Sequence, residues 1–232
     1  MLKPLLLSLF LIATAAHAGE NEVRATLQKS YPQIGKIEQV NKSPLPGLYE
    51  VVTQSQLFYT DEKVQYLIDG NLYELKSMRN LTDERARQLF SISFDSLPLD
   101  LAVKKVKGNG SRKLAYFTDP NCGFCKKLER EMQNVNNVTL YLFLYPVFEG
   151  SEDKVRAVWC SKDRARAWDD LMLKGTVPPA GTCNAPVAQV LQLGHKLKVN
   201  GTPTLVLADG TVVPGFLPAS ELEKALNASN KH

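Results

Sequence analysis

The spacing of hydrophobic and polar positions separates a strand-rich first part of the chain from a second part in which strands and helices alternate. Residues 20–30 have a short, polar helical pattern, and short apolar runs of strand type follow from residue 34 to residue 75. Asp69-Gly70 between two of these runs is a strong hairpin signal. This part is expected to form a small α+β domain of about 60 residues, which alone would bury little surface. The expected strands are 34–40, 48–54, 56–60, 64–68 and 72–75.

A helix is predicted to follow, because Asn80 or Thr82 can cap its first turn and two acidic residues favour the positive end of the helix dipole. It is expected to run to about Phe94 and to end before Leu97, which precedes a proline. A helix between two domains is typical of a semi-rigid connector, and the alternative is that it packs on the second domain. The expected division is a first domain at 19–79, a linker helix at 80–97 and a second domain at 98–232.

The second part alternates strands and helices, which predicts an α/β domain with a helical insertion. Residues 138–147 are almost all apolar, as expected of a strand that is buried on both faces. Ser220 is expected to cap the last helix. The expected strands are 113–118, which is the first clear one, 138–147, 204–208 and 211–213. The expected helices are 122–134, 152–174, 186–199 and 221–228.

The overall composition is that of an ordinary globular protein. Of the 232 residues, 44% are hydrophobic and 22% are charged, which excludes a disordered or fibrous chain. The net charge of +4 is small and is not concentrated in a basic run. Nucleic acid is therefore not an expected partner.

Residues 1–18 have the form of a secretory signal peptide. A short positively charged start precedes an apolar run at 5–16, and Ala16-His17-Ala18 matches a small-x-small cleavage site. Cleavage is expected after Ala18, so the mature protein would work where disulfides persist. A bacterial periplasm fits this expectation better than the lumen of the endoplasmic reticulum.

The candidate chemistry lies in the motif Cys122-Gly123-Phe124-Cys125, which follows a predicted strand and opens a predicted helix. A thiolate at a helix N-terminus faces unpaired backbone N–H groups and the positive end of the helix dipole, which keep it nucleophilic at neutral pH. We expect Cys122 to be exposed and to attack a disulfide. We expect Cys125 to be sheltered and to resolve the resulting mixed disulfide.

Two other interpretations of the motif remain open. Zinc binding usually needs two pairs of ligands, and the remaining cysteines, Cys160 and Cys183, stand far apart in the sequence. A purely structural disulfide between Cys122 and Cys125 would close a very short loop and stabilise little. Both are weaker than the redox interpretation, and no metal or other cofactor is expected.

A proline far downstream supports the redox interpretation. Gly201-Thr202-Pro203 stands immediately before a predicted strand, where a proline is tolerated. A cis peptide bond before Pro203 would turn the chain sharply and leave the backbone of Thr202 free to bind an extended peptide.

Together these features resemble a thioredoxin fold and, in detail, the bacterial periplasmic disulfide isomerases DsbC and DsbG. The similarity is carried by FTDPNCGFCKKLEREM (117–132), the Cys160 and Cys183 pair, GTPTLVLADGTVVPGF (201–216) and the N-terminal α+β domain with its connecting helix. Gly123 favours the DsbC branch, whereas Phe124 stands where that branch usually has tyrosine. The substitution keeps the aromatic ring, removes a hydroxyl and bears on the redox potential.

The resemblance implies a cystatin-like α+β dimerisation domain, a connecting helix and an α/β thioredoxin fold with a helical insertion. It implies a V-shaped homodimer whose cleft holds unfolded chains, and a DsbD-type membrane reductase as electron donor. Carried over by position, Cys122 is the nucleophile and Cys125 the resolving thiol. Thr202 and a cis-Pro203 form the substrate-binding turn. Mis-oxidised secreted proteins would be the substrates.

The second cysteine pair is interpreted as a structural disulfide between Cys160 and Cys183. In the chain-entropy model, closing a loop of about 24 residues would stabilise the fold by roughly 3–3.5 kcal/mol. The alternative is a second redox pair, although neither cysteine begins a predicted helix. The resemblance also implies a structural disulfide in this insertion.

Two rival functions remain. The same motif could serve a dithiol oxidase, since the sequence does not determine the reduction potential. A dimeric chaperone could instead bind unfolded chains and make little use of the cysteines. Elsewhere, Trp159 and Trp168 are expected in the core and His195 in a surface or hydrogen-bonded place, whereas Asp119 either tunes proton transfer or shapes a turn.

Overall fold

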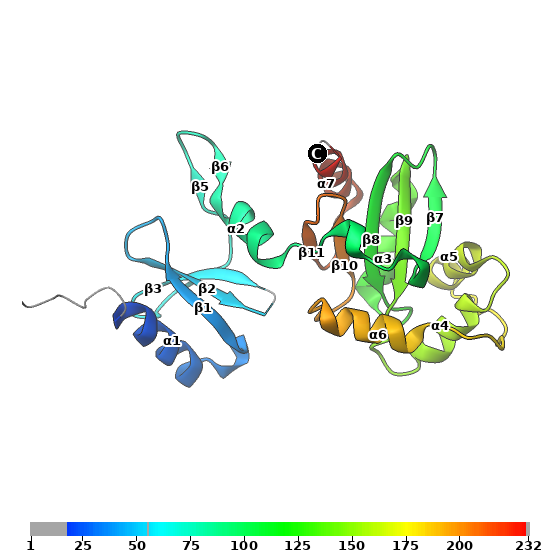
Figure 1. Ribbon diagram of the computed structural model, residues 1–232, viewed down its shortest axis with the longest axis horizontal. Coiled ribbons are helices and arrows are strands. Elements are labelled where there is room, and N and C mark those ends of the chain that lie inside the picture. The colour runs from blue at the N-terminus through cyan, green and yellow to red at the C-terminus, as the bar shows by residue number, and fades with distance from the viewer. Residues whose placement is uncertain (1–17, 55, 231–232) are drawn as a thin grey trace, which may run out of the picture. The chain divides into compact units, whose positions relative to one another are not determined.

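The computed structural model describes residues 18–230 except residue 55. These described residues form two compact units, which divide between Met78 and Arg79 (Figure 1). The expected signal peptide lies outside the described residues apart from Ala18, with which the first helix begins. Within the described residues, no helix is both long and apolar enough to cross a lipid bilayer.

The first unit is an antiparallel sheet with a helix packed along it (Figure 1). Its elements are α1 (Ala18–Ser30), η1 (Pro32–Ile34), β1 (Ile37–Lys42), β2 (Leu48–Thr53), β3 (Leu57–Asp61), β4 (Leu67–Ile68) and β5 (Tyr73–Glu74). Sheet neighbours follow the order β1-β2-β3-β4. Val23 and Leu27 stand four positions apart on one face of α1 and pack against apolar residues of the strands, including Val51 and Phe58. This helix-on-sheet core is the expected α+β arrangement.

The prediction of a hairpin at Asp69-Gly70 is wrong. β4 pairs with β3, whereas β5 belongs to a separate two-stranded sheet, so Asp69-Gly70 connects two sheets. The hairpin forms one step earlier, between β3 and β4. There a carboxylate oxygen of Asp61 accepts the N–H groups of Gln65 at 2.8 Å and Tyr66 at 2.9 Å. The side chain of Asp61 thus accepts the backbone N–H groups of this turn, and an Asp-Gly dipeptide pattern does not indicate such an interaction.

The second unit contains a mixed sheet in the order β11-β10-β8-β9-β7. β8 and β9 are parallel, and the other neighbours are antiparallel. The strands are β6 (Arg79–Asn80), β7 (Val103–Lys107), β8 (Arg112–Thr118), β9 (Val138–Leu144), β10 (Thr204–Leu207) and β11 (Val212–Pro214). The helices are α2 (Leu81–Phe90), η2 (Phe94–Ser96), η3 (Leu99–Leu101), α3 (Gly123–Glu131), η4 (Met132–Asn134), α4 (Ser151–Trp159), α5 (Arg164–Lys174), α6 (Val187–Lys196) and α7 (Ala219–Ser229).

Alternate residues of the central strands build a core on each face of this sheet. Leu114 and Tyr116 of β8 point into a cluster with residues of α3, α4, α5 and α7, and this cluster holds both tryptophans. Ala115 and Phe117 of the same strand point the other way, into a cluster with residues of α6 and of the segment 92–102. The period-two alternation of a strand explains this division. The prediction that Trp159 and Trp168 belong to the core is confirmed.

The connecting helix is shorter than predicted. Its cap is Asn80 rather than Thr82, because the side-chain oxygen of Asn80 accepts the N–H of Asp83 at 3.0 Å. The helix ends at Phe90, four residues before the expected end. Beyond it the N–H of Ile92 donates to the carbonyl of Gly210 at 2.9 Å. The helix therefore ends just before the chain forms a hydrogen bond with Gly210, a residue distant in sequence.

Three further local predictions need correction. β7 was not expected, because three of its five residues are lysines, yet it pairs with β9 at the sheet edge. The long helix predicted at 152–174 is two helices, and Asp163 caps the second by accepting the N–H of Arg166. Ser220 lies inside α7 and does not cap it. The N–H of Ala219 is satisfied instead by the carboxylate of Glu131 at 2.9 Å.

Candidate active site

Cys122 is the N-cap residue of α3, in the loop that follows β8. Its backbone is extended, with φ −76° and ψ 122°, and its sulfur accepts the N–H of Cys125 at 3.3 Å. An N-cap side chain satisfies one of the backbone donors that a helix leaves unpaired. The sulfur therefore stands at the positive end of the helix dipole, as the sequence predicted.

The Thr202–Pro203 turn meets this thiol from the far end of the chain. The peptide bond between the two residues is cis, and the thiol of Cys122 donates to the main-chain oxygen of Thr202 at 3.2 Å. The carbonyl of Pro203 accepts the N–H of Gly215 at 2.7 Å, which ties the turn to the end of β11. The structure thus brings Cys122, Cys125 and Thr202 together.

Cys122 is more buried than expected, whereas Cys125 is sheltered as predicted. The expectation that Cys122 is exposed is wrong, since only 4% of its surface is accessible, whereas Cys125 is completely buried. The N-cap position directs the sulfur of Cys122 toward the Thr202 turn, which helps to cover it. Phe124, between the two cysteines, projects outward and is 64% exposed.

The interior position of Cys125 alters its acidity. Its side chain packs with Leu128 and Met132 in the core of the unit. Burial raises the pKa of the Cys125 thiol from 9.0 to about 12, because the charged thiolate would lose its hydration. Cys125 is therefore held as a neutral thiol at neutral pH.

Asp119 shapes the loop before the motif. Its buried carboxylate accepts hydrogen bonds through one oxygen from the N–H of Asn121 at 2.7 Å and the hydroxyl of Ser151 at 2.6 Å. The other oxygen accepts the N–H groups of Val147 at 2.7 Å and Phe148 at 3.0 Å. Of the two interpretations from the sequence, these contacts favour the turn. Asp119 joins the Cys122 loop to the loop after β9.

A buried carboxylate that the sequence did not reveal lies on α3. Glu129 is completely buried, and its Oε1 accepts the hydroxyl of Tyr116 at 2.7 Å and the indole N–H of Trp168 at 2.8 Å. The Nζ of Lys105 lies 3.6 Å from Oε2, and Lys105 also pairs with Asp169. The sequence feature that could have revealed its burial is its position, because Glu129 stands four residues after Cys125, on the buried face of the helix.

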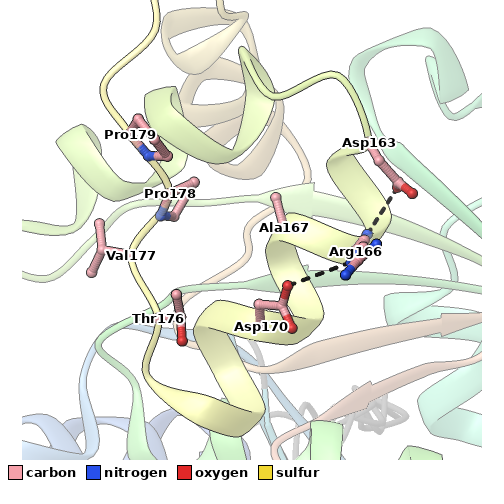
Figure 2. Close-up of a pocket in the computed structure, with 8 residues that line it drawn as sticks. All are labelled: Asp163, Arg166, Ala167, Asp170, Thr176, Val177, Pro178 and Pro179. Atoms are coloured by element: carbon pink, nitrogen blue, oxygen red, sulfur yellow. Dashed lines mark hydrogen bonds and ion pairs between the residues drawn. The ribbon is translucent and has the colours of Figure 1, made fainter.

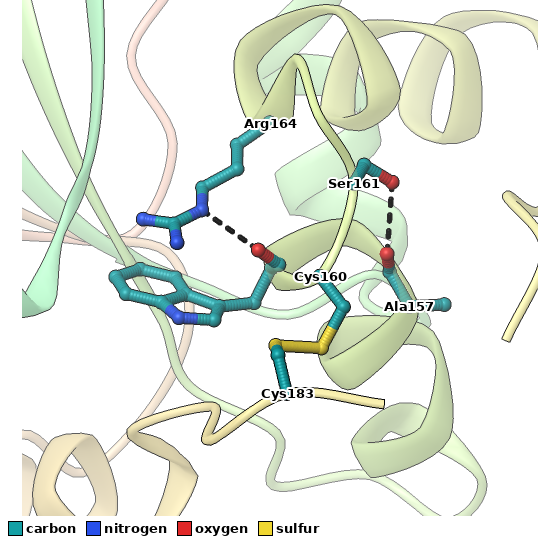
Figure 3. Close-up of a disulfide and its surroundings, with 6 residues drawn as sticks. Ala157, Cys160, Ser161, Arg164 and Cys183 are labelled. Carbon is teal, nitrogen blue, oxygen red and sulfur yellow. Dashed lines mark hydrogen bonds between the residues drawn. A yellow bond between two sulfur atoms is a disulfide. The ribbon is translucent and has the colours of Figure 1, made fainter. Parts of the chain in front are cut away.

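Cys160 and Cys183 are joined by a disulfide with their Cα atoms 5.6 Å apart (Figure 3). Arg164 lies over the ring of Trp159 at 4.0 Å and donates to its carbonyl at 2.7 Å, which closes the turn beside the bond. The chain passes close at Gly181, where an added Cβ would lie 2.6 Å from that of Cys160. Because these two sulfurs are bonded to each other, they do not form a zinc site with the Cys122 motif.

A pocket of about 270 Å³ lies between α5 and the chain that follows it (Figure 2). It is lined by Asp163, Arg166, Ala167, Asp170, Thr176, Val177, Pro178 and Pro179. None of the residues predicted for the site is part of this lining. His195, for which a surface place was one expectation, is exposed on α6.

Both parts of the chain match known families. Residues 99–230 match the thioredoxin-like domain, over more than half of the chain, and residues 14–83 match the N-terminal domain of disulfide bond isomerase proteins. A crystal structure of a disulfide interchange protein from Neisseria gonorrhoeae is similar with a TM-score of 0.57 and 40% identity. The similarity covers 59% of this chain and 100% of that chain.

Two relatives that match most of this chain agree with these family matches. The probable thiol:disulfide interchange protein DsbC of Bordetella parapertussis is 48% identical over 188 residues, which are 81% of this chain and 67% of that protein. The thiol:disulfide interchange protein DsbC of Escherichia coli K12 is 29% identical over 215 residues, 89% of each. The expected thioredoxin fold with its helical insertion is thereby confirmed. The chain belongs to the DsbC family of thiol:disulfide interchange proteins, which are thiol–disulfide oxidoreductases.

Proposed function

We propose that this protein isomerises or reduces incorrect disulfides in secreted proteins through Cys122 and Cys125. The observation that carries the proposal is the position of the Cys122 sulfur, between the N-terminus of α3 and the carbonyl of Thr202. There the sulfur accepts the backbone N–H of Cys125 at the start of the helix. Opposite it lies a turn whose backbone can align an extended peptide.

The proposed reaction proceeds by thiol–disulfide exchange. The Cys122 thiolate attacks one sulfur of a substrate disulfide, a new bond joins the two sulfurs, and the other substrate sulfur leaves as a thiolate. That thiolate can attack another disulfide of the same substrate, and Cys122 is released once the pairing is corrected. Alternatively Cys125 loses its proton and attacks Cys122, which leaves the protein oxidised and the substrate reduced by two electrons.

Phe124, Thr202 and Pro203 complete the proposed site. Thr202 would bind the substrate backbone through its main chain, and Pro203 would hold that main chain beside the thiol. Gly123 occupies the first helical position, where no side chain screens the sulfur. The Cys160–Cys183 disulfide takes no part in exchange in this proposal and serves to hold the helical insertion.

We propose that the first unit joins two copies of the chain. β4 is an edge strand of its sheet, and Tyr66, Leu67 and Ile68 at this edge are 70%, 53% and 46% exposed. An edge strand that carries exposed apolar side chains favours pairing with another strand. In this assignment residues 19–79 form the dimerisation domain, 80–97 the linker and 98–232 the catalytic domain.

The proposed compartment is the bacterial periplasm, supported by the signal-peptide pattern of residues 1–18 with cleavage after Ala18. Isomerisation requires the Cys122–Cys125 pair to be kept reduced in an oxidising compartment. A DsbD-type membrane reductase is the proposed electron donor.

The function is tested by the recovery of activity from scrambled ribonuclease with the reduced mature protein. Wild type should restore activity, Cys122→Ser should not, and Cys125→Ser should accumulate a mixed disulfide with the substrate. The double variant Cys160→Ala/Cys183→Ala serves as the matched control, because it removes the other two cysteines. If wild type fails here but its oxidised form rapidly oxidises reduced ribonuclease, the protein is an oxidase. If wild type and Cys122→Ser only suppress aggregation, it is a chaperone.

A further inference from the structure

Gly19, which directly follows the proposed cleavage site, packs against a tyrosine of β2. A Cβ added to Gly19 would collide with the hydroxyl oxygen of Tyr49 and would lie 3.5 Å from a carboxylate oxygen of Glu62. Any other residue at this position would therefore have to displace Tyr49. Because the nitrogen of Gly19 is bonded to the same Cα atom, it lies within about 6 Å of this oxygen of Glu62.

The side chain of Tyr49 has an unused hydrogen-bonding group at this point. Only 6% of the surface of Tyr49 is accessible, and its hydroxyl forms no hydrogen bond within the part of the chain that the structure describes. Polar groups of buried residues usually have a partner. Tyr49 belongs to the same core cluster as Val23 and Leu27 of α1, so its ring is held in place. The hydroxyl can therefore accept a hydrogen bond from a donor at Gly19.

Three carboxylates surround the same hydroxyl. Burial raises the pKa of Tyr49 above its ordinary value, and the negative charges of Glu62, Glu20 and Glu22 raise it further. Glu20 also accepts the N–H of Lys42 at 3.3 Å, whereas Glu62 forms no ion pair among the described residues. Lys42 pairs with Tyr49 across the sheet and is the cation that faces this group from β1. Three negative charges thus meet one positive charge here.

Signal-peptide cleavage creates a new cation at this point. Hydrolysis of the bond between Ala18 and Gly19 adds the elements of water, so Ala18 leaves with a carboxylate and Gly19 keeps an amino group. An α-amino group is mostly protonated at neutral pH and then carries one charge and three N–H donors. The dipole of α1 disfavours a positive charge at its N-terminus. Only the surrounding carboxylates can therefore make this position favourable for the ammonium group.

We propose that the α-ammonium group of Gly19, formed by signal-peptide cleavage, pairs with the carboxylate of Glu62 and donates a hydrogen bond to the hydroxyl of Tyr49. These contacts join the start of α1 to β2 and to the turn after β3. The first unit therefore reaches its full stability only after the signal peptide is removed. This inference rests on the proposed cleavage after Ala18 and assigns a structural role to the processed terminus.

The test uses the whole mature chain with a protease site placed before Gly19, so that cleavage leaves Gly19 as the first residue. The rate of acetylation of the Gly19 amine is read by mass spectrometry of the N-terminal peptide. An ion pair raises the pKa of the amine and slows acetylation, so Glu62→Gln should accelerate it at least about 3-fold at about pH 7. At about pH 10 the amine is uncharged in both proteins, and the rates should be equal.

Glu38→Gln is the matched control, because it removes an equal charge from an exposed position on β1. Its acetylation rate should equal that of wild type at both pH values. A difference between wild type and Glu62→Gln that persisted at about pH 10 would show that Glu62 only limits access of the reagent, and would overturn the ion pair.

Hydrogen–deuterium exchange of α1 measures the effect on stability. In wild type, the amides of residues 23–30 should exchange at least about 3-fold more slowly after the protease cleavage than before it. Glu62→Gln and Tyr49→Phe should lose most of this difference. Because each protein is compared with its own uncleaved form, a general loss of stability in a variant does not affect the result.

The outcomes separate this inference from the proposed exchange reaction. Equal acetylation of wild type and Glu62→Gln at about pH 7, or an equal acceleration in Glu38→Gln, would overturn the ion pair. Equal exchange before and after cleavage would overturn the gain in stability. If the protein exported to a bacterial periplasm does not begin at Gly19, the proposed cleavage site and this inference both fail. The reaction at Cys122 is tested independently by the ribonuclease assay.

Discussion

The backbone N–H of Cys125 donates to the sulfur of Cys122 at 3.3 Å. The residue proposed to release Cys122 from a mixed disulfide therefore also holds the Cys122 sulfur in place. The two cysteines differ in surroundings despite this contact. Cys122 caps the helix beside the Thr202 turn, whereas Cys125 lies in the core with no accessible surface. This division matches the proposed roles of an attacking and a resolving thiol.

The first prediction concerns alkaline pH. Burial raises the pKa of Cys125 from 9.0 to about 12, so the folded protein keeps a proton that the unfolded chain releases between these values. The unfolded state then binds fewer protons, and stability falls as the pH rises. For the reduced protein, the urea-derived free energy of unfolding should decrease from about pH 9 to pH 11, by up to about 1.4 kcal/mol per pH unit from this group.

Cys125→Ala is the control for this measurement, because it lacks the thiol but keeps the other groups that titrate in alkali. The difference between the two proteins reports Cys125 alone. Identical pH slopes in wild type and variant would show that Cys125 loses its proton as easily in the folded protein as in the unfolded chain.

The second prediction concerns Asp119. Replacement by alanine removes the acceptor for three backbone N–H groups and for the hydroxyl of Ser151 in a buried place. Asp119→Ala should therefore lower the free energy of unfolding by at least about 3 kcal/mol. Ser151→Ala removes one of these bonds and should cost about 1 kcal/mol. Urea unfolding measures both.

An exposed acidic residue nearby tests whether the effect comes from the buried hydrogen bonds. Asp153→Ala, in the first turn of α4, should cost no more than about 1 kcal/mol through the helix dipole. Equal losses in Asp119→Ala and Asp153→Ala would contradict the assignment of Asp119 as the link between the two loops.

The third prediction concerns Glu129. Glu129→Ala would leave the hydroxyl of Tyr116, the indole N–H of Trp168 and the ammonium group of Lys105 without this buried partner. The expected loss of stability is about 3–5 kcal/mol, whereas Tyr116→Phe should cost about 1 kcal/mol. Because the two residues share a hydrogen bond, the losses should be non-additive when the substitutions are combined.

A surface glutamate provides the comparison for Glu129. Glu221→Ala breaks a half-exposed ion pair with Lys224 and should change stability by less than about 1 kcal/mol. Additive losses for Glu129→Ala and Tyr116→Phe in the double variant would show that their hydrogen bond contributes little.

Local patterns predicted those parts of the fold whose causes are local. The apolar run of β9 and the placement of Cys122 at the start of a helix both follow from neighbouring residues. β7 was missed because its lysines dominate a short edge strand, whose existence depends on pairing with β9. The early end of α2 likewise depends on Gly210, which is distant in sequence from Ile92.

The same distinction between local and distant causes explains which features of the candidate site could be predicted. The motif and the Thr202–Pro203 turn could be recognised separately, because each has a local signature. The burial of Cys122 could not, since it depends on how closely Thr202 approaches. Glu129 was missed because a glutamate on a helix usually faces water, and only the positions of Tyr116 and Trp168 make its burial favourable.

The last prediction separates the two cysteine pairs. Cys160 and Cys183 are 23 positions apart, and loss of their bond should lower the free energy of unfolding by about 3 kcal/mol through the entropy of the unfolded chain. Cys160→Ala/Cys183→Ala should nevertheless keep thiol–disulfide exchange, because Cys122 and Cys125 are untouched. Urea unfolding and the scrambled-ribonuclease assay on the same preparation test both statements. A variant that remains as stable as wild type but loses exchange would make Cys160 and Cys183 a second redox pair, with a role beyond holding the insertion.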